Sequence, residues 1–370
     1  MSANEDTKAT AKRSKAKTRV VIVDDSALSR AILREMLQAE GDIEVVGEAE
    51  NGYDAVGVVD ALTPDVVTMD IDMPGPSGLD TIGWIMEKSP LPILVVTGER
   101  LGDGSALGFH AIERGAADFA SKPSIEDAAA LARIRTQVRA ISGLSVTPRN
   151  TRPDILEDAH RIVAAMTPRD GIDVIGFCSG IGGHRTLMRI LRRLPPLPCA
   201  VVVSQHMAPR FGSAFMKYLQ RMTPQPVRLA TREPTPLTRG SIWVCDASAH
   251  LECPQRGEIV AIEAAPEGAY RPSGNRLLSS LASAFGRAAI GVVCAGSGDD
   301  GATGLRALKD AGGLTIVESP ETAVPADMPR AATAAQAAVR ALPAELIADY
   351  LASAFADPNK STAPPSFKKS

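Results

Sequence analysis

Short apolar runs alternate with amphipathic stretches along most of this chain. Between residues 19 and 140 the runs RVVIV, DVVTM and PILVV are rich in β-branched residues, which is typical of strands buried on both faces. The stretches between such runs place apolar side chains at helical spacing, as Leu28, Ile32 and Met36 do. Strands that alternate with helices in this way predict a parallel sheet covered by helices on both faces.

The same alternation resumes after residue 170, with strand-like runs such as IDVIGFC, AVVVSQH, GEIVAIEA and AIGVVCAG. The intervening segment is rich in Pro, Thr, Ser and Arg, as a linker is. The predicted fold class is therefore α/β, with two doubly wound parallel-sheet domains. The predicted parts are a tail at 1–18, a first domain at 19–140, a linker at 141–169, a second domain at 170–350 and a tail at 351–370.

Composition and charge narrow the class of protein. The chain has 370 residues, 45% of them hydrophobic, and a formal net charge of -3. Two domains with sizeable cores are expected, and the near balance of charge disfavours a nucleic-acid partner. Neither a membrane-spanning run nor a secretory signal is evident, so we expect a cytoplasmic protein without direct membrane insertion. The odd number of cysteines, without a C-x-x-C pair, predicts buried free thiols at Cys178, Cys199, Cys245, Cys253 and Cys294.

Carboxylates follow two strands of the first domain. RVVIV runs directly into Asp24 and Asp25, and DVVTM runs into Asp70, with Asp72 two residues later. Ligands of such sheets bind beyond the carboxyl ends of the strands, so these side chains are expected to converge. Carboxylates packed together repel one another, and a hard cation with oxygen ligands, here Mg²⁺, is the usual remedy.

Two further strand ends complete this pattern. Thr97 follows the strand ILVV, and Lys122 precedes a proline in AADFASKP. A hydroxyl and an ammonium group suit the oxygens of an acyl phosphate. Together, VVDDSALSR, MDIDMPGPSGLD, VVTG and FASKPS resemble a two-component receiver domain over residues 19–140.

The receiver resemblance implies a role for each of these residues. It implies that Asp70 is phosphorylated by a histidine kinase, and that Asp25 and Asp70 hold Mg²⁺ with the backbone carbonyl of Asp72, supported by Asp24. Thr97 would follow the phosphoryl group, Lys122 would pair with it, and Phe119 would be the aromatic switch position. Such a switch works because added charge biases a bistable set of loops.

Three strand ends of the second domain carry a different chemistry. Ser179 follows IDVIGFC, His206 follows AVVVSQ, and Asp300 lies in AGSGDDG after IGVVC. A serine, a histidine and an aspartate at three strand ends suit acyl transfer by a serine nucleophile, with Gly-rich turns as oxyanion donors.

A nucleotide-binding interpretation competes for part of this region. The motif GSGDDG at 296–301 follows a strand, precedes a helix and is followed by a strand ending in Glu318, as in a dinucleotide fingerprint. However, Asp299 and Asp300 would place carboxylates where a pyrophosphate must bind. This interpretation is therefore the remote one.

The second domain also resembles a known family. QHMAPRF, YRPSGNRLLSSLASAFG, GSGDDGATGL and MPRAA resemble the catalytic domain of the chemotaxis protein-glutamate methylesterases, CheB. The resemblance implies hydrolysis of glutamate γ-methyl esters on methyl-accepting chemoreceptors, often with glutamine deamidation, without a cofactor for the ester chemistry. It also implies that the receiver covers the active site until a chemotaxis histidine kinase phosphorylates it. His206 matches the family's general base and Asp300 its histidine-orienting aspartate.

The chain departs from this family at the nucleophile. Counting back from Gly182-Gly183 places Gly180 where the family has its serine, so Ser179 comes one residue early. A slip of one residue in extended chain turns a side chain to the opposite face. Ser179 can reach His206 only if the turn bulges, and Cys178 is the second candidate nucleophile.

Two functions therefore remain open at this point. One is a working methylesterase that uses Ser179, His206 and Asp300. The other is a catalytically inactive regulator that keeps the fold to bind receptors or to act as a phosphate sink. The receiver motifs are complete in both cases.

Overall fold

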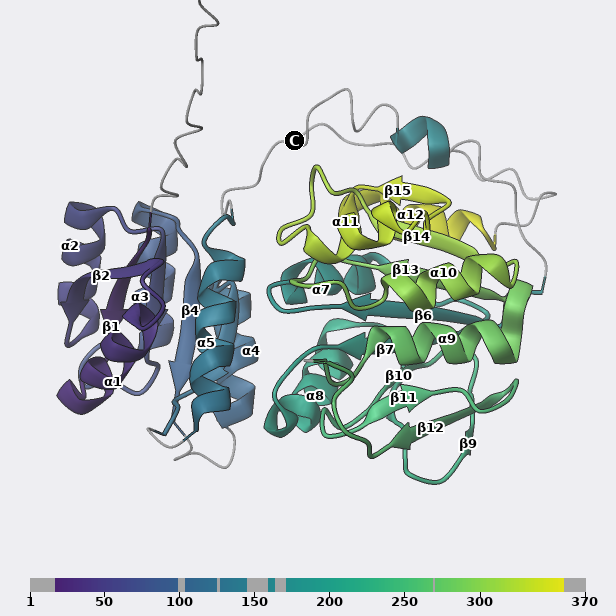
Figure 1. Cartoon of the computed structure of the whole chain (residues 1–370), viewed down its shortest axis with the longest axis horizontal. Helices are drawn as coiled ribbons and strands as arrows, with labels where there is room; N and C mark the ends of the chain where they lie inside the picture. Colours follow the sequence, from purple (N-terminus) through teal and green to yellow (C-terminus); the bar gives the residue numbers. More distant parts are fainter. Residues whose placement is uncertain are drawn as a thin grey trace, which may run out of the picture.

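The computed structural model describes residues 17–98, 104–124, 127–144, 159–163, 171–268 and 270–355. These residues form two parallel sheets, each with helices on both faces, as the alternation of apolar runs predicts (Figure 1). Most of the predicted linker and nearly all of both predicted tails lie outside the described residues. In the ranges that are described, no helix has the length and apolar character needed to cross a bilayer.

The first sheet has the strand order β2-β1-β3-β4-β5 and is parallel throughout. Alternate residues of β1 point to opposite faces: Val20 packs with α1 and α5, whereas Val21 packs with α2, α3 and α4. The strands are β1 (Thr18–Val23), β2 (Ile43–Ala49), β3 (Val66–Met69), β4 (Ile93–Thr97) and β5 (Asp118–Ser121). The helices are α1 (Ala27–Gln38), α2 (Gly52–Leu62), α3 (Gly78–Lys88), α4 (Gly104–Arg114) and α5 (Ala128–Ile141).

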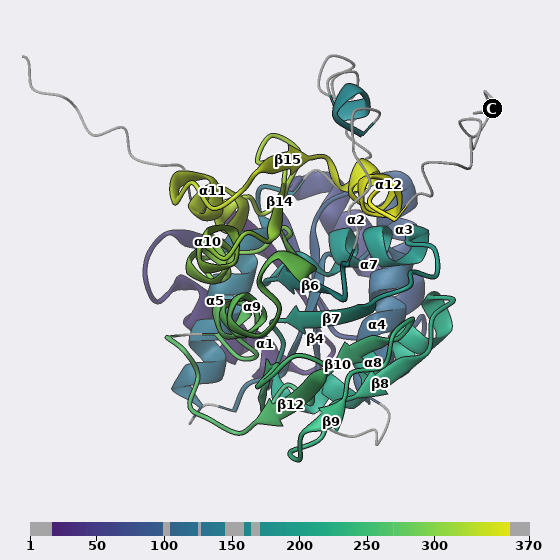
Figure 2. The same ribbon diagram turned by 90° about the vertical axis from the view of Figure 1, so that its right-hand side faces the viewer.

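The second parallel sheet has the order β15-β14-β13-β6-β7-β10-β8. Its strands are β6 (Val174–Ser179), β7 (Ala200–Gln205), β8 (Val227–Leu229), β10 (Ile242–Val244), β13 (Ala289–Val293), β14 (Leu314–Glu318) and β15 (Arg340–Leu342). One face is covered by α9 (Gly274–Phe285), α10 (Ala302–Asp310) and α11 (Asp327–Ala334), and the other by α7 (His184–Arg193), α8 (Gly212–Met222) and α12 (Ala344–Ser353) (Figure 2). All five cysteines are buried and free, as predicted.

One apolar run does not join this sheet. GEIVAIEA forms β12 (Glu258–Ile262), which pairs antiparallel with β11 (His250–Glu252) and β9 (Thr235–Pro236) in a small separate sheet. The sequence pattern groups it with the parallel strands. The five residues between β11 and β12 are too few for the crossover that parallel pairing requires, so a hairpin forms instead.

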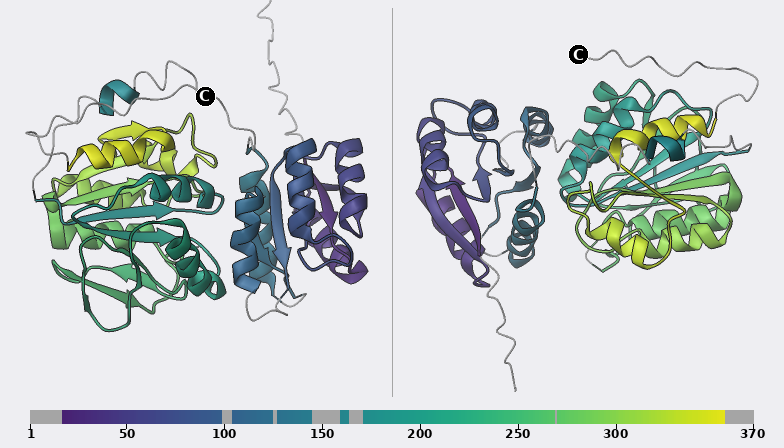
Figure 3. Two further views of the ribbon diagram at one scale, coloured as in Figure 1. Left: turned by 180° about the vertical axis from the view of Figure 1, so that it is seen from behind. Right: turned by 90° about the horizontal axis from the view of Figure 1, so that it is seen from above.

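Aromatic side chains connect the two domains. The α4 and α5 side of the first domain faces the second (Figures 1 and 3). The Phe109 ring of α4 lies 4.9 Å from that of Tyr218 and 5.7 Å from that of Phe215, both on α8. The Phe119 ring of β5 meets Phe211 edge-on at 4.5 Å. One hydrophobic core therefore continues from the first domain into the second.

Candidate functional site

The carboxylates predicted at the strand ends of the first domain lie together. Asp24 follows β1 and Asp70 follows β3, and these strands are neighbours in the sheet. Both side chains are buried, whereas Asp25 is exposed. Carboxylate oxygens of Asp24, Asp25 and Asp70 lie within 4.8 Å of one another. Oxygen donors at this spacing are the ligand type that Mg²⁺ prefers, so the donor set fits this ion.

Lys122, which directly follows β5, contacts the acidic cluster formed by Asp24, Asp25 and Asp70. Its Nζ donates to Asp70 Oδ2 at 2.6 Å and pairs with Asp24 Oδ2 at 2.7 Å. Burial raises the pKa of Asp70, and the neighbouring Lys122 ammonium offsets part of this. Burial works to lower the pKa of Lys122, but its bonds to Asp24 and Asp70 outweigh that and raise it. The lysine is therefore held as a cation beside the aspartate.

Thr97 and Phe119 occupy the positions expected of them on β4 and β5. Thr97 ends β4, is buried, and its carbonyl accepts a hydrogen bond from the Lys122 backbone N–H at 2.8 Å. Phe119 is also buried, and its ring contacts Phe109, Phe211 and the His184 ring. The aromatic position of β5 thus packs against the second domain, three residues before the lysine of the acidic cluster.

In the second domain, the predicted histidine and aspartate form a buried pair. His206 follows β7, and Asp300 lies between β13 and α10. His206 Nε2 lies 2.7 Å from Asp300 Oδ2, and the histidine's Nδ1 has no hydrogen-bond partner among the residues that the structure describes. A histidine fixed through one nitrogen and free at the other is arranged as a general base is in acyl-transfer enzymes.

Asp300 is fully buried and held by many donors. Besides His206, it accepts hydrogen bonds from the Ser273 hydroxyl and from the backbone N–H groups of Gly274, Asn275 and Gly301. Burial would raise the pKa of Asp300, but the bonds from His206 and the backbone outweigh it and lower the pKa below the ordinary value. The carboxylate is therefore ionised and rigidly oriented toward His206.

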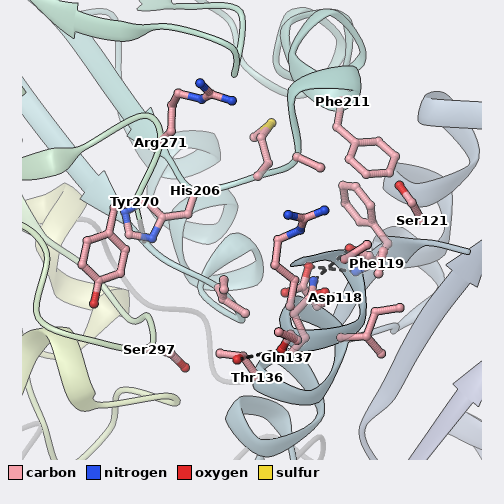
Figure 4. A pocket seen from close by; sticks show the side chains of 18 of the residues that line it. Asp118, Phe119, Ser121, Thr136, Gln137, His206, Phe211, Tyr270, Arg271 and Ser297 are labelled. Atoms are coloured by element: carbon pink, nitrogen blue, oxygen red, sulfur yellow. Dashed lines mark hydrogen bonds between the residues drawn. The ribbon is translucent and has the colours of Figure 1, made fainter. Parts of the chain in front are cut away.

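Two neighbours fix the position of His206. The Tyr270 ring stacks on the imidazole at 4.9 Å between centroids, at an angle of 16° (Figure 4). The buried Gln205 side chain donates to the carbonyls of Gly180 and His206, at 3.0 and 3.1 Å. Gln205 thereby joins the chain at the end of β7 to the turn after β6.

The predicted nucleophile is not brought to His206. Ser179 ends β6, is fully buried, and its hydroxyl donates to the Ala295 carbonyl at 3.3 Å. His206 Nδ1, the ring nitrogen free to accept a serine proton, makes no hydrogen bond. The two residues meet only through their backbones, where His206 N–H donates to the Ser179 carbonyl at 3.0 Å.

Gly180 stands where a side chain would approach His206. A Cβ built at this glycine would lie 3.3 Å from His206 Nδ1, but only 2.5 Å from Met328 Sδ and 2.9 Å from Gly296 Cα. The position facing the free imidazole nitrogen thus belongs to residue 180, in agreement with the displacement counted from the sequence. The Met328 side chain and the Gly296 backbone fill the space that a side chain at residue 180 would need.

Cys178 lies near the pair but is not poised for attack. Its sulfur lies within 4.8 Å of ligand atoms of His206 and Asp300. Burial, then Asp300, then Cys294 raise the pKa of the Cys178 thiol well above its usual value. Because the thiolate is the nucleophilic form, the raised pKa disfavours nucleophilic attack by this cysteine.

Asp300 of the glycine-rich motif at 296–301 bonds to other parts of the same domain. Asp300 accepts hydrogen bonds at the start of α9 and α10, and Glu318 is buried with its carboxylate accepting the Ala295 N–H at 2.7 Å. An acidic residue that binds ribose must face the ligand. Glu318 faces the interior, so the geometry does not favour a dinucleotide here.

Sequence reasoning missed a contact between the domains at this site. Asp118, the first residue of β5, accepts a hydrogen bond from the Gly182 N–H at 3.1 Å and lies 3.4 Å from His184 Nδ1. Burial lowers the pKa of His184. The one signal in the sequence is an aspartate inside the otherwise apolar run before Phe119.

Models of two protein families match this chain. The model described as CheB methylesterase matches residues 175–351, and the model described as response regulator receiver domain matches residues 20–135. Both match the segments whose motifs carried the two resemblances. The receiver and methylesterase resemblances are thereby confirmed.

Relatives with a methylesterase name match over most of this chain and most of their own length. The protein-glutamate methylesterase/protein-glutamine glutaminase 2 of Anaeromyxobacter dehalogenans is 38% identical over 334 residues, covering 89% of this chain and 94% of its own. The corresponding protein of Pyrococcus abyssi is 31% identical over 327 residues, covering 85% and 88%. The crystal structure of the Thermotoga maritima CheB methylesterase catalytic domain aligns with 50% of this chain and 98% of its own, at 27% identity and a TM-score of 0.46.

Proposed function

The chain belongs to the CheB methylesterase family, and we propose that it is a phosphorylation-controlled protein-glutamate methylesterase of chemoreceptors. In the reaction, water and a glutamate γ-methyl ester give a glutamate carboxylate and methanol. Deamidation of glutamine to glutamate is the parallel reaction, with ammonia as the leaving group. The observation that carries the proposal is the buried pair of His206 and Asp300, with His206 Nδ1 free.

The receiver supplies the control. In the proposed switch, a carboxylate oxygen of Asp70 attacks the phosphorus of the kinase's phosphohistidine, the P–N bond breaks, and an acyl phosphate forms while the kinase's histidine leaves. Lys122 pairs with the phosphoryl oxygens, and the Thr97 hydroxyl binds one of them. Asp25 and Asp70, with the Asp72 carbonyl and support from Asp24, would hold Mg²⁺, which neutralises charge on the transferring group.

The ester chemistry falls to the second domain. Ser179 Oγ attacks the ester carbonyl, and His206 accepts the serine proton and delivers it to the leaving methanol, which leaves the glutamyl group bonded to Ser179. Water, deprotonated by His206, then attacks this acyl-serine; the bond to Ser179 Oγ breaks, His206 returns the proton to the serine, and the glutamate carboxylate is released. Asp300 keeps the imidazole oriented and stabilises its cationic form. Because the Ser179 hydroxyl now bonds to the Ala295 carbonyl, catalysis requires the turn at 179–183 to rearrange. Gly180 and Gly182 give this turn the conformational freedom to do so.

A second function is favoured by one specific observation. The position facing His206 Nδ1 belongs to Gly180, which has no side chain to act as nucleophile. A protein that kept this geometry throughout would bind receptors and accept phosphoryl groups without hydrolysing esters. The two functions share the receiver and differ only in the turn after β6.

Methanol release from methylated receptor by the full-length chain separates the two functions. The measurement is made with and without acetyl phosphate and Mg²⁺, with receptor binding and Asp70 phosphorylation followed in the same samples. We expect release that increases on phosphorylation. Binding and phosphorylation without release, in both states, would establish the non-hydrolytic function.

A further inference from the structure

Asp118 carries a carboxylate of the receiver into the second domain. It begins β5, and only 1% of its surface is exposed. One carboxylate oxygen accepts the Phe119 N–H at 2.8 Å, and the other accepts the Gly182 N–H at 3.1 Å. A buried carboxylate is costly unless donors surround it, so the groups that receive Asp118 form an anion-binding position.

This position lies at the amino end of α7. Gly183, the N-cap residue, contributes no capping side chain, so the first N–H groups of the helix need an acceptor. Anions are favoured there by the helix dipole and by the unpaired N–H groups. The carboxylate of Asp118, bonded to the Gly182 N–H, supplies negative charge from the other domain.

His184 independently marks the same position. The side chain is 4% exposed, and neither ring nitrogen makes a hydrogen bond within the described part of the chain. Its Nδ1 lies 3.4 Å from Asp118 Oδ1, too far or too poorly aligned for a full bond. A buried imidazole without a partner implies a better-fitting acceptor than the one present.

The anion position opens into the cavity that contains the proposed catalytic histidine. A cavity of about 620 Å³ lies between the domains, and both His184 and His206 line it. Arg133 of α5 and Arg271 also line it, so the cavity offers two cationic side chains. Figure 4 shows Asp118 and His206 on its opposite walls.

We propose that the Gly182 N–H, the amino end of α7 and His184 form a subsite for the carboxylic oxygens of a glutamyl side chain, and that Asp118 fills this subsite in the resting chain. This inference rests on the proposed function. It means that the receiver does more than cover the site, because one of its side chains takes the place of the substrate. Separation of the domains withdraws Asp118 and frees the donors.

Glutarate binding to the full-length chain tests this proposal without requiring hydrolysis. Calorimetric titration of the unphosphorylated protein is expected to give at least tenfold tighter binding for Asp118→Ala than for the natural sequence, because the subsite becomes vacant. Adding His184→Ala to Asp118→Ala should return the affinity to the starting level. Equal glutarate affinity in the natural chain and Asp118→Ala would overturn the proposal.

Two matched variants separate occupancy from other causes. Glu113→Ala removes the side chain that lies 3.7 Å from Arg221 across the α4–α8 contact, so it deletes one exposed contact between the domains while Asp118 stays in the subsite. It should leave glutarate binding unchanged, and a gain equal to that of Asp118→Ala would contradict the proposal. Asp118→Asn keeps an oxygen that accepts the Gly182 N–H, so we expect it to exclude glutarate as the natural chain does.

Folding and the proposed function are checked separately. Each variant must accept a phosphoryl group from acetyl phosphate at the natural rate, which shows that its receiver is intact. Tight glutarate binding by Asp118→Ala without methanol release would support the subsite and count against the esterase. Methanol release without any gain in glutarate binding would support the esterase and overturn the subsite.

Discussion

The phosphoacceptor centre and the His206–Asp300 centre are both built at the carboxyl edge of a parallel sheet, yet they differ in completeness. In the receiver, Lys122 contacts both Asp24 and Asp70 directly. In the second domain, His206 and Asp300 are paired, but the Ser179 hydroxyl bonds elsewhere. The receiver residues follow their strands in the expected register, whereas Ser179, the proposed nucleophile, is displaced by one position. The second domain has a serine, a histidine and an aspartate, yet a displacement of one residue keeps the serine hydroxyl away from the histidine.

The largest effect should come from Asp70→Asn. Without a carboxylate, no acyl phosphate can form, so labelling by acetyl phosphate should fall to background in mass spectrometry of the intact chain. Asp72→Asn is the matched control, because its exposed side chain changes while its backbone carbonyl remains. Labelling that persisted in Asp70→Asn would mean that another residue accepts the phosphoryl group. It would contradict the view that the receiver site is complete.

Asp300→Asn should cost nearly as much in hydrolysis. The amide keeps the shape of the side chain but cannot stabilise the imidazolium, and such changes reduce turnover by ~10³- to 10⁴-fold. Methanol release by the phosphorylated chain is the measurement. Asp299→Asn, next in the chain, contacts Tyr270 rather than His206 and should retain most activity. Similar losses in both variants would mean that the dyad has no special role.

Gly180→Ser tests whether residue 179 or residue 180 is placed to supply the nucleophile. A hydroxyl at residue 180 faces His206 Nδ1, but its Cβ collides with Met328 and Gly296. If Ser179 is the nucleophile, this crowding should hold the turn out of place and reduce methanol release by about 100-fold. Gly180→Ala serves as the control without a hydroxyl. An increase with serine but not alanine would show that the natural chain lacks a nucleophile.

The smallest effect is on stability and concerns Glu318. Burial raises the pKa of Glu318 from 4.5 to about 7. Since the protonated form is favoured in the folded state, the stability that it contributes is present below pH 4.5 and is lost as the pH rises through 7. Glu318→Gln keeps an acceptor for the Ala295 N–H without the charge. Urea unfolding should show the variant more stable by on the order of 2 kcal/mol at pH 8 and equal to the natural chain near pH 4. Equal stability at both pH values would contradict the raised pKa.

Much of this architecture could be predicted from the order of the elements. The β-branched runs gave both parallel sheets, because strands buried on two faces leave a strong signal. They could not separate β12 from the parallel strands, since an apolar run does not reveal the direction of its partner. That required the short β11–β12 connection seen in the structure.

The sites were predictable where chemistry follows a strand end in the chain. Asp70 and His206 directly follow their strands, and Asp300 lies in the loop between β13 and α10, so topology alone places each of them at the carboxyl edge of its own sheet. The role of Asp118 was not predictable, because its partners Gly182 and His184 belong to the other domain. No local pattern encodes a contact between residues that far apart in sequence.

Ser179→Ala tests the central claim most directly. The full-length chain and this variant would be compared for methanol release from methylated receptor, after phosphorylation with acetyl phosphate and Mg²⁺. The account predicts strong release by the natural chain and a loss of at least 10³-fold in the variant, with receptor binding and Asp70 phosphorylation unchanged. Equal release by both proteins would contradict it and remove Ser179 from the chemistry.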